Sequence, residues 1–307
     1  MSIQTVDVPV IEEAGAIAEA VQARRGNPLV QELMFVIRRS RSVQVGLAVT
    51  GTLLAVAALA DVLAPYSPIE IDLLRRLQPP SAAHLLGTDQ IGRDELSRVI
   101  HGARVSLFVG LVAVTIASTV GSVLGLVAGY VGGFVDDVIM RVMDALLAFP
   151  AILLALVIVS ALGPGLVNTL IAFGIAGIPF YARLLRSMVL SIRARQYVLA
   201  ARALGASHGR LMLRHVMPNS VGPMIVAMTL QTGTVIVGIA GLGYLGLGAQ
   251  PPTPEWGNML SGSQALLFSA PWLLFSPGIA ILLAVVGFNL IGDGLRDALD
   301  PRLRQSR

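Results

Sequence analysis

Six stretches of the chain are long and almost wholly apolar, and shorter polar segments separate them. A hydrocarbon core about 30 Å thick is crossed by roughly 20 apolar residues in helical form. Each stretch is therefore predicted to form one membrane-spanning helix. The predicted spans are Gln44–Leu63, Leu107–Tyr130, Met143–Leu162, Val167–Ala182, Val221–Leu245 and Trp272–Ile291.

The third and fourth spans are predicted to form a helical hairpin. No charged residue occurs between Ala145 and Ala182, but Gly163-Pro164-Gly165 interrupts this stretch. Glycine and proline together break a helical pattern. The six runs are far longer than barrel strands and do not alternate between apolar and polar positions, so helices are the structure that can cross lipid here. The predicted fold class is all-α, a polytopic membrane helical bundle.

Small residues recur at helical spacing within these spans. Gly121, Gly125 and Gly129 are four positions apart, and further glycines crowd the end of the fifth span. Small residues let helix backbones approach closely inside a membrane. Two interpretations remain open: an interface in a multi-subunit pore, or packing inside this one bundle, which the pattern favours.

Composition supports a membrane protein and excludes several chemistries. The chain is 55% hydrophobic and 13% charged, whereas soluble domains carry about 25% charged residues. Every one of the 22 basic residues is arginine, which excludes a phosphate-binding loop with its lysine. There is no cysteine, hence no disulfide or thiolate site. The four histidines lack metal-ligand spacing; His84, near Asp89 and Asp94, is interpreted as a loop residue. We predict no metal and no nucleic-acid partner.

Arginine placement predicts the orientation and the division of the chain. Seventeen arginines fall on one predicted side and five on the other, all five between Arg75 and Arg104. The positive-inside rule puts the arginine-rich side, with both termini, in the cytoplasm of a multi-pass plasma-membrane protein.

We predict a cytoplasmic tail over 1–42 with an interfacial elbow helix at Pro28–Arg41, and no cleavable signal peptide. A first span and periplasmic loop occupy 43–106, a core domain 107–294 and a cytoplasmic tail 295–307.

The cytoplasmic segment 195–218 is the most informative polar stretch. It mixes helix formers with arginine, Gly205 stands where one short helix would stop, and Pro218 can open the next helix. The predicted structure is helix, glycine turn, helix, then the fifth span. A short helix rich in alanine can insert into a groove of a partner and act as a lever. The equally weighted alternative is a solvated connector.

Polar residues near the membrane offer few candidates for chemistry. Asp144 is predicted to pair with Arg141 as an interfacial anchor rather than to serve an ion relay, and Asp136 and Asp137 are predicted to be solvated loop residues. One polar group on the later spans could face a solute path, with interhelical hydrogen bonding as the alternative. These candidate path residues are Gln231, Thr232, Thr234 and Asn289.

The spacing Ala200-Ala201-x3-Gly205-x12-Pro218 resembles the "EAA" loop of bacterial ABC importer permeases. Three further stretches, in the right order, resemble "C"-type permeases of the dipeptide, oligopeptide and nickel class: Gly87–Leu107, Leu245–Gly257 and Phe288–Pro301. Together the four cover residues from about 30 to 304. Two positions depart from the family pattern, because Leu199 and Ile239 stand where members often have glutamate.

The resemblance implies a type I importer permease fold and a transport subunit without its own ATPase site. It implies a second homologous permease, two ATPase subunits that bind ATP and Mg²⁺, and an extracytoplasmic solute-binding protein. The implied solutes are peptides, although related permeases carry nickel, glutathione or haem-like cargo. The resemblance also implies that a coupling helix docks into the ATPase; its residues here are Ala200, Ala201, Arg202, Ala203, Leu204, Gly205 and Pro218.

An ion-gradient-driven secondary transporter or channel is the alternative function. Such a protein would carry paired carboxylates near mid-membrane and often internal repeats. The sequence shows no carboxylate at mid-span and no clear repeat. A membrane-embedded enzyme is a weaker alternative still, because no His, Asp or Glu cluster occurs at a shared depth.

Overall fold

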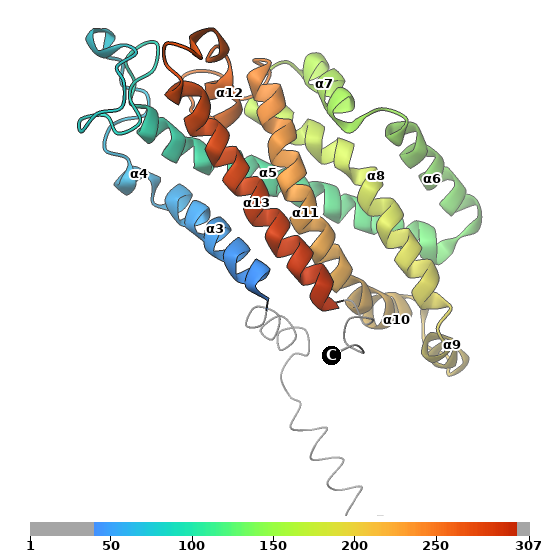
Figure 1. Cartoon of the computed structure of the whole chain (residues 1–307). Coiled ribbons are helices and arrows are strands. Elements are labelled where there is room, and N and C mark those ends of the chain that lie inside the picture. Colours follow the sequence, from blue (N-terminus) through green and yellow to red (C-terminus); the bar gives the residue numbers. More distant parts are fainter. Residues whose placement is uncertain (1–39, 300–307) are drawn as a thin grey trace, which may run out of the picture.

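A computed structural model describes residues 40–299 of the 307-residue chain, and these residues are helical, with a single isolated β-bridge and no sheet. The all-α prediction is confirmed (Figure 1). The predicted elbow helix and the ends of both tails lie outside the described residues. The elements are α3 (Arg41–Ala58), α4 (Ala60–Leu63), η1 (Leu73–Arg75), α5 (Glu95–Val131), α6 (Gly133–Leu147), α7 (Ala151–Leu162), α8 (Leu166–Arg193), α9 (Gln196–Ala203), α10 (His208–Leu211), the π-helical turn η2 (Met212–Val216), α11 (Met217–Tyr244), α12 (Trp256–Leu260), η3 (Gln264–Leu266) and α13 (Trp272–Leu299).

Five continuous helices of the described part are long and apolar enough to cross a membrane, and one bent helix pair makes up to six spans. The continuous ones are α3, α5, α8, the run from α10 through α11, and α13. The bent pair is α6 with α7, whose axes meet at 88°. The structure therefore agrees with the predicted number of spans, but the third span is not the straight helix that the sequence suggested.

Several predicted boundaries are wrong, including the start of the second span, which lies at Glu95 rather than Leu107, and the end of the fourth, which lies at Arg193 rather than Ala182. The third span begins at Gly133 rather than Met143, and it breaks at Pro150, where proline lacks the N–H needed to continue a helix. The first span is interrupted at Leu59, where α3 ends and α4 begins. The last helix continues beyond Ile291 to Leu299. Hydropathy locates apolar runs well, but amphipathic helix ends extend past them. The predicted turn at Gly163–Gly165 is confirmed, since it separates α7 from α8.

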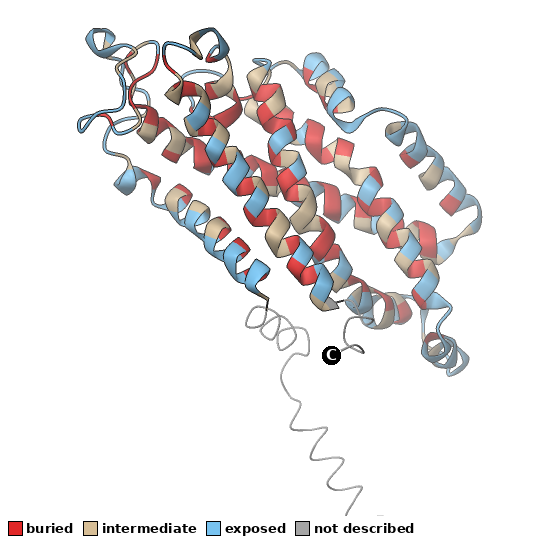
Figure 2. Ribbon diagram, viewed as in Figure 1, coloured by how far each residue is buried: buried red, intermediate tan, exposed pale blue. Residues whose placement is uncertain are grey.

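Helix α5 packs closely against α8 through its glycines. A Cβ atom at Gly121 would lie 2.6 Å from the carbonyl oxygen of Ile178, and one at Gly129 would lie 3.0 Å from that of Arg186. A Cβ at Gly125 would collide with the carbonyl group of Ala182. These three glycines therefore serve packing inside this bundle, the interpretation that the pattern favoured. Buried residues follow the facing sides of the helices in Figure 2.

The two ends of the bundle differ in architecture. The start of α3, the end of α13 and the short helices α9 and α10 gather at one end (Figure 1), called here the α9 end. Long loops, α4 and α12 gather at the other, called the α12 end. Helix α5 has 37 residues, which corresponds to about 55 Å at 1.5 Å per residue. It therefore reaches from the loops of the α12 end to the neighbourhood of α9.

Candidate functional site

The connection between α8 and α11 contains the predicted helix, glycine turn and second helix. Helix α9 ends in a Schellman motif, in which Ala206 N–H donates to the Ala201 carbonyl at 3.1 Å and Gly205 N–H donates to that of Arg202 at 3.0 Å. Gly205 has a φ of +83°, the left-handed conformation that favours glycine. The sequence therefore ends α9 and reverses the chain at one defined residue.

The second helix differs from the prediction because it runs without a break into the fifth span. Ser207 caps α10 by accepting a hydrogen bond from Arg210 N–H at 3.4 Å, and the π-helical turn η2 then joins α10 to α11. Pro218 lies in the first turn of α11, as predicted. π-helical turns inside α-helices are frequent at functional sites. A displacement of α10 would therefore be carried directly into α11.

Helix α9 is fixed to the bundle by one side and exposed on the other. Val198 is buried and packs in a cluster with Ile192 and Leu211, and Ala201 packs against that cluster from its edge. The opposite side of the segment presents apolar side chains to the surroundings. The exposed fractions are 51% for Leu199 and 89% for Leu204. The remaining predicted coupling residues, Ala200, Arg202, Ala203, Gly205 and Pro218, are also exposed.

Polar contacts tie this segment to neighbouring helices. Arg193, at the end of α8, donates from Nη1 to the carbonyl oxygens of Gly129 (3.0 Å) and Tyr130 (3.2 Å) at the end of α5. The hydroxyl of Tyr130 lies 2.9 Å from Nδ1 of His208 in α10. Helices α5, α8 and α10 are thus linked where α9 begins. The α9 segment is therefore an exposed apolar element, and helices α5, α8 and α10 hold it in place.

The four candidate path residues do not form one cluster. Gln231 lines a groove of about 500 Å³ between α8, α11 and α13, and Thr234 is exposed. Thr232 is buried inside the bundle, where its hydroxyl donates to the Met228 carbonyl at 2.8 Å, so it does not line that groove. Asn289 of α13 lies against Gly233 of α11. The other side chains lining the groove are Phe180, Leu184, Pro223, Val226, Ala227, Leu230 and Arg296.

The predicted surroundings of Asp144 and Asp136 on α6 are wrong, whereas Asp137 is exposed as predicted but lies on the helix rather than in a loop. Asp144 pairs with Arg183 of α8 at 2.5 Å rather than with Arg141. Asp136 is not a solvated loop residue, since it is buried on α6 and pairs with Arg186 of α8. Periodicity does not report how far α6 lies from α8, so the local spacing of Arg141 and Asp144 was misleading. The sequence does contain one signal for these pairs, because α6 carries acidic residues and α8 carries arginines.

The segment from Gly87 to Arg98 builds a polar cap at the α12 end. Asp94 caps α5 through Ser97 N–H at 2.8 Å, and it also binds Nδ1 of His84 at 2.8 Å. His84 is therefore a buried loop residue in a hydrogen-bonded pair. Trp272 of α13 donates from Nε1 to the Thr88 carbonyl at 3.2 Å. The motif thus fastens the long loop to the first turn of α5 and to α13.

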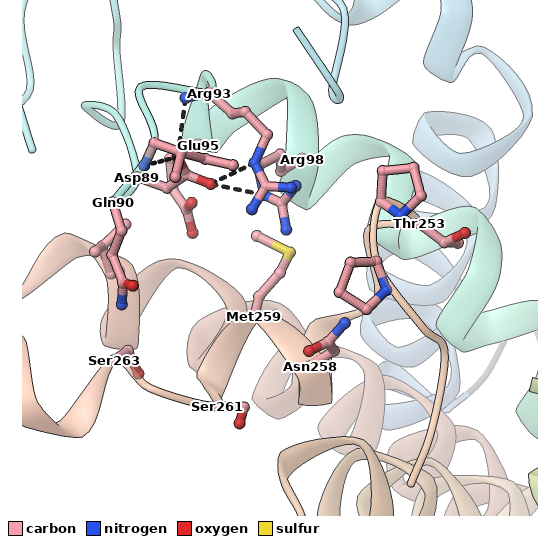
Figure 3. A pocket seen from close by; sticks show the side chains of 14 residues that line it. Asp89, Gln90, Arg93, Glu95, Arg98, Thr253, Asn258, Met259, Ser261 and Ser263 are labelled. Carbon is pink, nitrogen blue, oxygen red and sulfur yellow. Dashed lines mark hydrogen bonds and ion pairs between the residues drawn. The ribbon is translucent and has the colours of Figure 1, made fainter. Parts of the chain in front are cut away.

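A polar pocket of about 170 Å³ opens between this cap and the loop before α13 (Figure 3). Its acidic side chains already have partners within the protein. Asp89 binds Nε of Arg93 at 2.6 Å and lies 3.6 Å from Nε of Arg98. Glu95 accepts a hydrogen bond from Ser276 at 2.8 Å. We therefore interpret the pocket as part of the structural cap. Within residues 40–299, no group of three or more His, Cys, Asp or Glu could hold a metal ion.

Glu255 fastens the other loop at this end. Its carboxylate accepts hydrogen bonds from the N–H groups of Gly257 and Asn258, both at 2.8 Å, and from the Ser106 hydroxyl at 3.3 Å. Burial raises the pKa of Glu255, although these hydrogen bonds oppose the rise. The neighbouring Trp256 is fully buried. This stretch was matched to a family by its sequence, but the sequence did not predict that Glu255 would hold the loop against α5 and α11.

The fold and the exposed α9 element define a polytopic membrane subunit that presents a short helix outside its spans. The family model described as "Binding-protein-dependent transport system inner membrane component" matches residues 121–305, and that for the "N-terminal TM domain of oligopeptide transport permease C" matches 29–80. The chain belongs to the family of binding-protein-dependent transport system inner membrane components. The chain is therefore a permease of an ABC importer and not the gradient-driven transporter or channel considered as the alternative.

Curated relatives agree with this family over most of their length. The chain is 50% identical to the dipeptide transport system permease protein DppC of Escherichia coli K12, over 90% of this chain and 94% of that one. It is 49% identical to the DppC of Alkalihalophilus pseudofirmus, over 87% and 88%. It is 48% identical to the glutathione transport system permease protein GsiD of Shigella flexneri, over 82% and 84%.

Proposed function

We propose that this chain is the permease subunit of an ATP-driven importer for dipeptides or oligopeptides. It pairs with a second, similar permease, binds two ATPase subunits at the α9 end, and receives solute from a binding protein at the α12 end. ATP and Mg²⁺ bind to the ATPase chains, and this chain carries out no bond chemistry. The single observation that carries the proposal is the exposed apolar α9 segment on its rigid support.

The structure of that segment supports a docking role. Leu199 and Leu204 are exposed outside the spans, with fractions of 51% and 89%. Exposed apolar surface of this kind marks a protein interface when it is not covered by lipid. The alanines beside it leave room for a partner's backbone. Leu199 replaces the family's glutamate, so the contact with the ATPase at this position is apolar rather than polar.

The direction of transport and the solute follow from the relatives and from charge. Two of the three named relatives are dipeptide permeases, and this supports dipeptides over the glutathione named for the third. The positive-inside rule supports a cytoplasmic α9 end, because that end holds most of the arginines. Gln231 and Thr234 are the candidate path residues that remain accessible on α11. The binding protein sets much of the specificity.

A pair of leucine variants tests the proposal. Leu204→Glu places a charge at the centre of the proposed ATPase contact and should release the ATPase chains from the purified complex, with loss of peptide-dependent ATP hydrolysis. Leu74→Glu is the matched control, since Leu74 is 94% exposed at the α12 end. The measurement is co-purification followed by ATP hydrolysis and uptake of labelled dipeptides in proteoliposomes. Retention of ATPase chains and activity by Leu204→Glu would contradict the proposal.

A further inference from the structure

Helix α6 is attached to the bundle by charge rather than by an apolar core. Of its side chains, only those of Asp136 and Met143 are buried. Apart from Met143, none of its apolar residues is buried, and the exposed fractions are 82% for Phe134 and 52% for Val142. In a membrane, packing apolar side chains against a neighbouring helix instead of lipid brings no hydrophobic gain. With few buried side chains on α6, its polar contacts with α8 are the specific attachment between the two helices.

The main attachment is a bidentate ion pair between Asp136 and Arg186. Nε of Arg186 lies 2.5 Å from Oδ1 of Asp136, and Nη2 lies 2.6 Å from Oδ2. The side chains are 12% and 34% exposed, respectively. Two parallel hydrogen bonds between a guanidinium group and a carboxylate fix orientation as well as distance. The pair is sheltered from water, so its attraction is weakly screened.

A second ion pair between the same helices is built differently. Asp144 and Arg183 share one contact of 2.5 Å, and their side chains are 58% and 51% exposed. An exposed single-contact pair contributes little to stability because solvent screens it. The chain therefore carries a sheltered pair and an exposed pair between α6 and α8. The exposed pair is a matched control for the sheltered one.

Arg186 stands on the helix that leads directly to α9. Helix α8 ends at Arg193, which is bound to the carbonyl groups at the end of α5, and α9 begins three residues later at Gln196. Val198 of α9 packs on Ile192 of α8. A displacement of α9 therefore moves the end of α8. On the other side, α6 continues through the 88° bend into α7.

We propose that Asp136 and Arg186 are positioning residues that make α6 move with α8 and α9 during transport. The ion pair carries motion from the α9 segment to α6, whose one buried apolar residue is Met143, whereas α7 is held to α8 by its own buried apolar contacts. This inference rests on the proposed function, because it assumes that a partner drives α9. Without the pair, ATP is hydrolysed but α6 no longer follows α8, and hydrolysis is uncoupled from solute movement.

The test compares neutral and charge-swapped variants in the complete complex. Asp136→Asn should leave the ATPase chains bound and basal ATP hydrolysis near the unmodified level. A hydrogen bond to a charged group typically shifts an equilibrium by about tenfold or more, so peptide transported per ATP should fall by about that factor. The double variant with Asp136→Arg and Arg186→Asp should restore coupling. Asp144→Asn, the control, should change the ratio less than about twofold.

A direct readout of α6 position accompanies the transport assay. The chain contains no cysteine, so cysteines can be introduced at Val138 and Ser187, both exposed, and spin-labelled without background. Asp136→Asn should broaden the distance distribution between the labels, and the charge swap should narrow it again. If Asp136→Asn keeps both the distance distribution and the transport ratio, or if the swap restores neither, the inference is wrong. If the unmodified complex fails to couple ATP hydrolysis to peptide uptake, the proposed function fails instead.

Discussion

At the scale of single residues, the sequence predicted positions better than partners. Gly205 was expected to end α9 and does so, because a left-handed residue at a helix end favours glycine for steric reasons that depend only on the local chain. Asp144 and Asp136 were misplaced because their partners, Arg183 and Arg186, lie 39 and 50 residues away. Contacts of that range depend on how helices pack, which periodicity does not report.

The conformation of Gly205 gives a prediction at this scale. Gly205→Ala should destabilise the end of α9 by about 1–2 kcal/mol, because a Cβ is disfavoured at positive φ. Gly205→Asn should be tolerated better, since asparagine visits this conformation more readily. We expect peptide-dependent ATP hydrolysis of the complex to fall in the order glycine, asparagine, alanine.

Gly209→Ala is the control for this series. Gly209 lies in α10 without a positive φ, and a Cβ there would meet nothing within 4 Å. Equal activity of the Gly205→Ala and Gly209→Ala complexes would show that the backbone conformation at Gly205 is unimportant.

At the scale of elements, the apolar runs predicted how many helices cross the membrane but not how they bend. The hairpin at Gly163–Gly165 was predicted because glycine and proline coincide there. The bend at Pro150 was missed because that proline lies inside an uninterrupted apolar run. The amphipathic helix α6 was missed for a similar reason: its Asp136 and Asp137 lowered the local hydropathy and were interpreted as a loop.

The close packing of α5 on α8 gives a prediction for these two elements. Gly125→Val should force the helices apart, because a Cβ at this position collides with backbone of Ala182 that cannot move aside as a side chain would. Overpacking of this kind typically costs about 1–3 kcal/mol. The measurement is the thermal unfolding midpoint of the purified protein in detergent.

Gly51→Val in α3 is the matched variant, because a Cβ at Gly51 would meet nothing within 4 Å. A midpoint that falls equally for both variants would mean that close approach of α5 to α8 is not what makes Gly125→Val harmful.

At the scale of the whole molecule, the two ends of the bundle have different chemistry. The α9 end holds most arginines and an exposed apolar helix, whereas the α12 end holds loops locked by buried hydrogen bonds. The sequence predicted this polarity from charge alone. It did not predict that the family-like segments near Gly87 and Glu255 act as locks, because their partners become adjacent only when the bundle forms.

Orientation in the membrane can be tested on the same two leucines. Cysteine introduced at Leu74 should react with a membrane-impermeant maleimide added outside intact cells, whereas cysteine at Leu204 should react only after the membrane is opened and the ATPase chains are removed. The absence of native cysteine removes background labelling. The reverse pattern of labelling would place the α9 end outside and would overturn the proposed direction of transport.

Helix α5 joins these two ends without an intervening hinge. Its first turn is capped by Asp94 in the loops of the α12 end, and its last turn accepts the hydrogen bonds of Arg193 beside α9. A continuous helix of this kind has no flexible joint at which a displacement would be absorbed. In the proposed importer, the docking of a loaded binding protein at the α12 end would therefore be transmitted through α5 to the α9 end, and ATP hydrolysis would wait for cargo without a diffusible messenger.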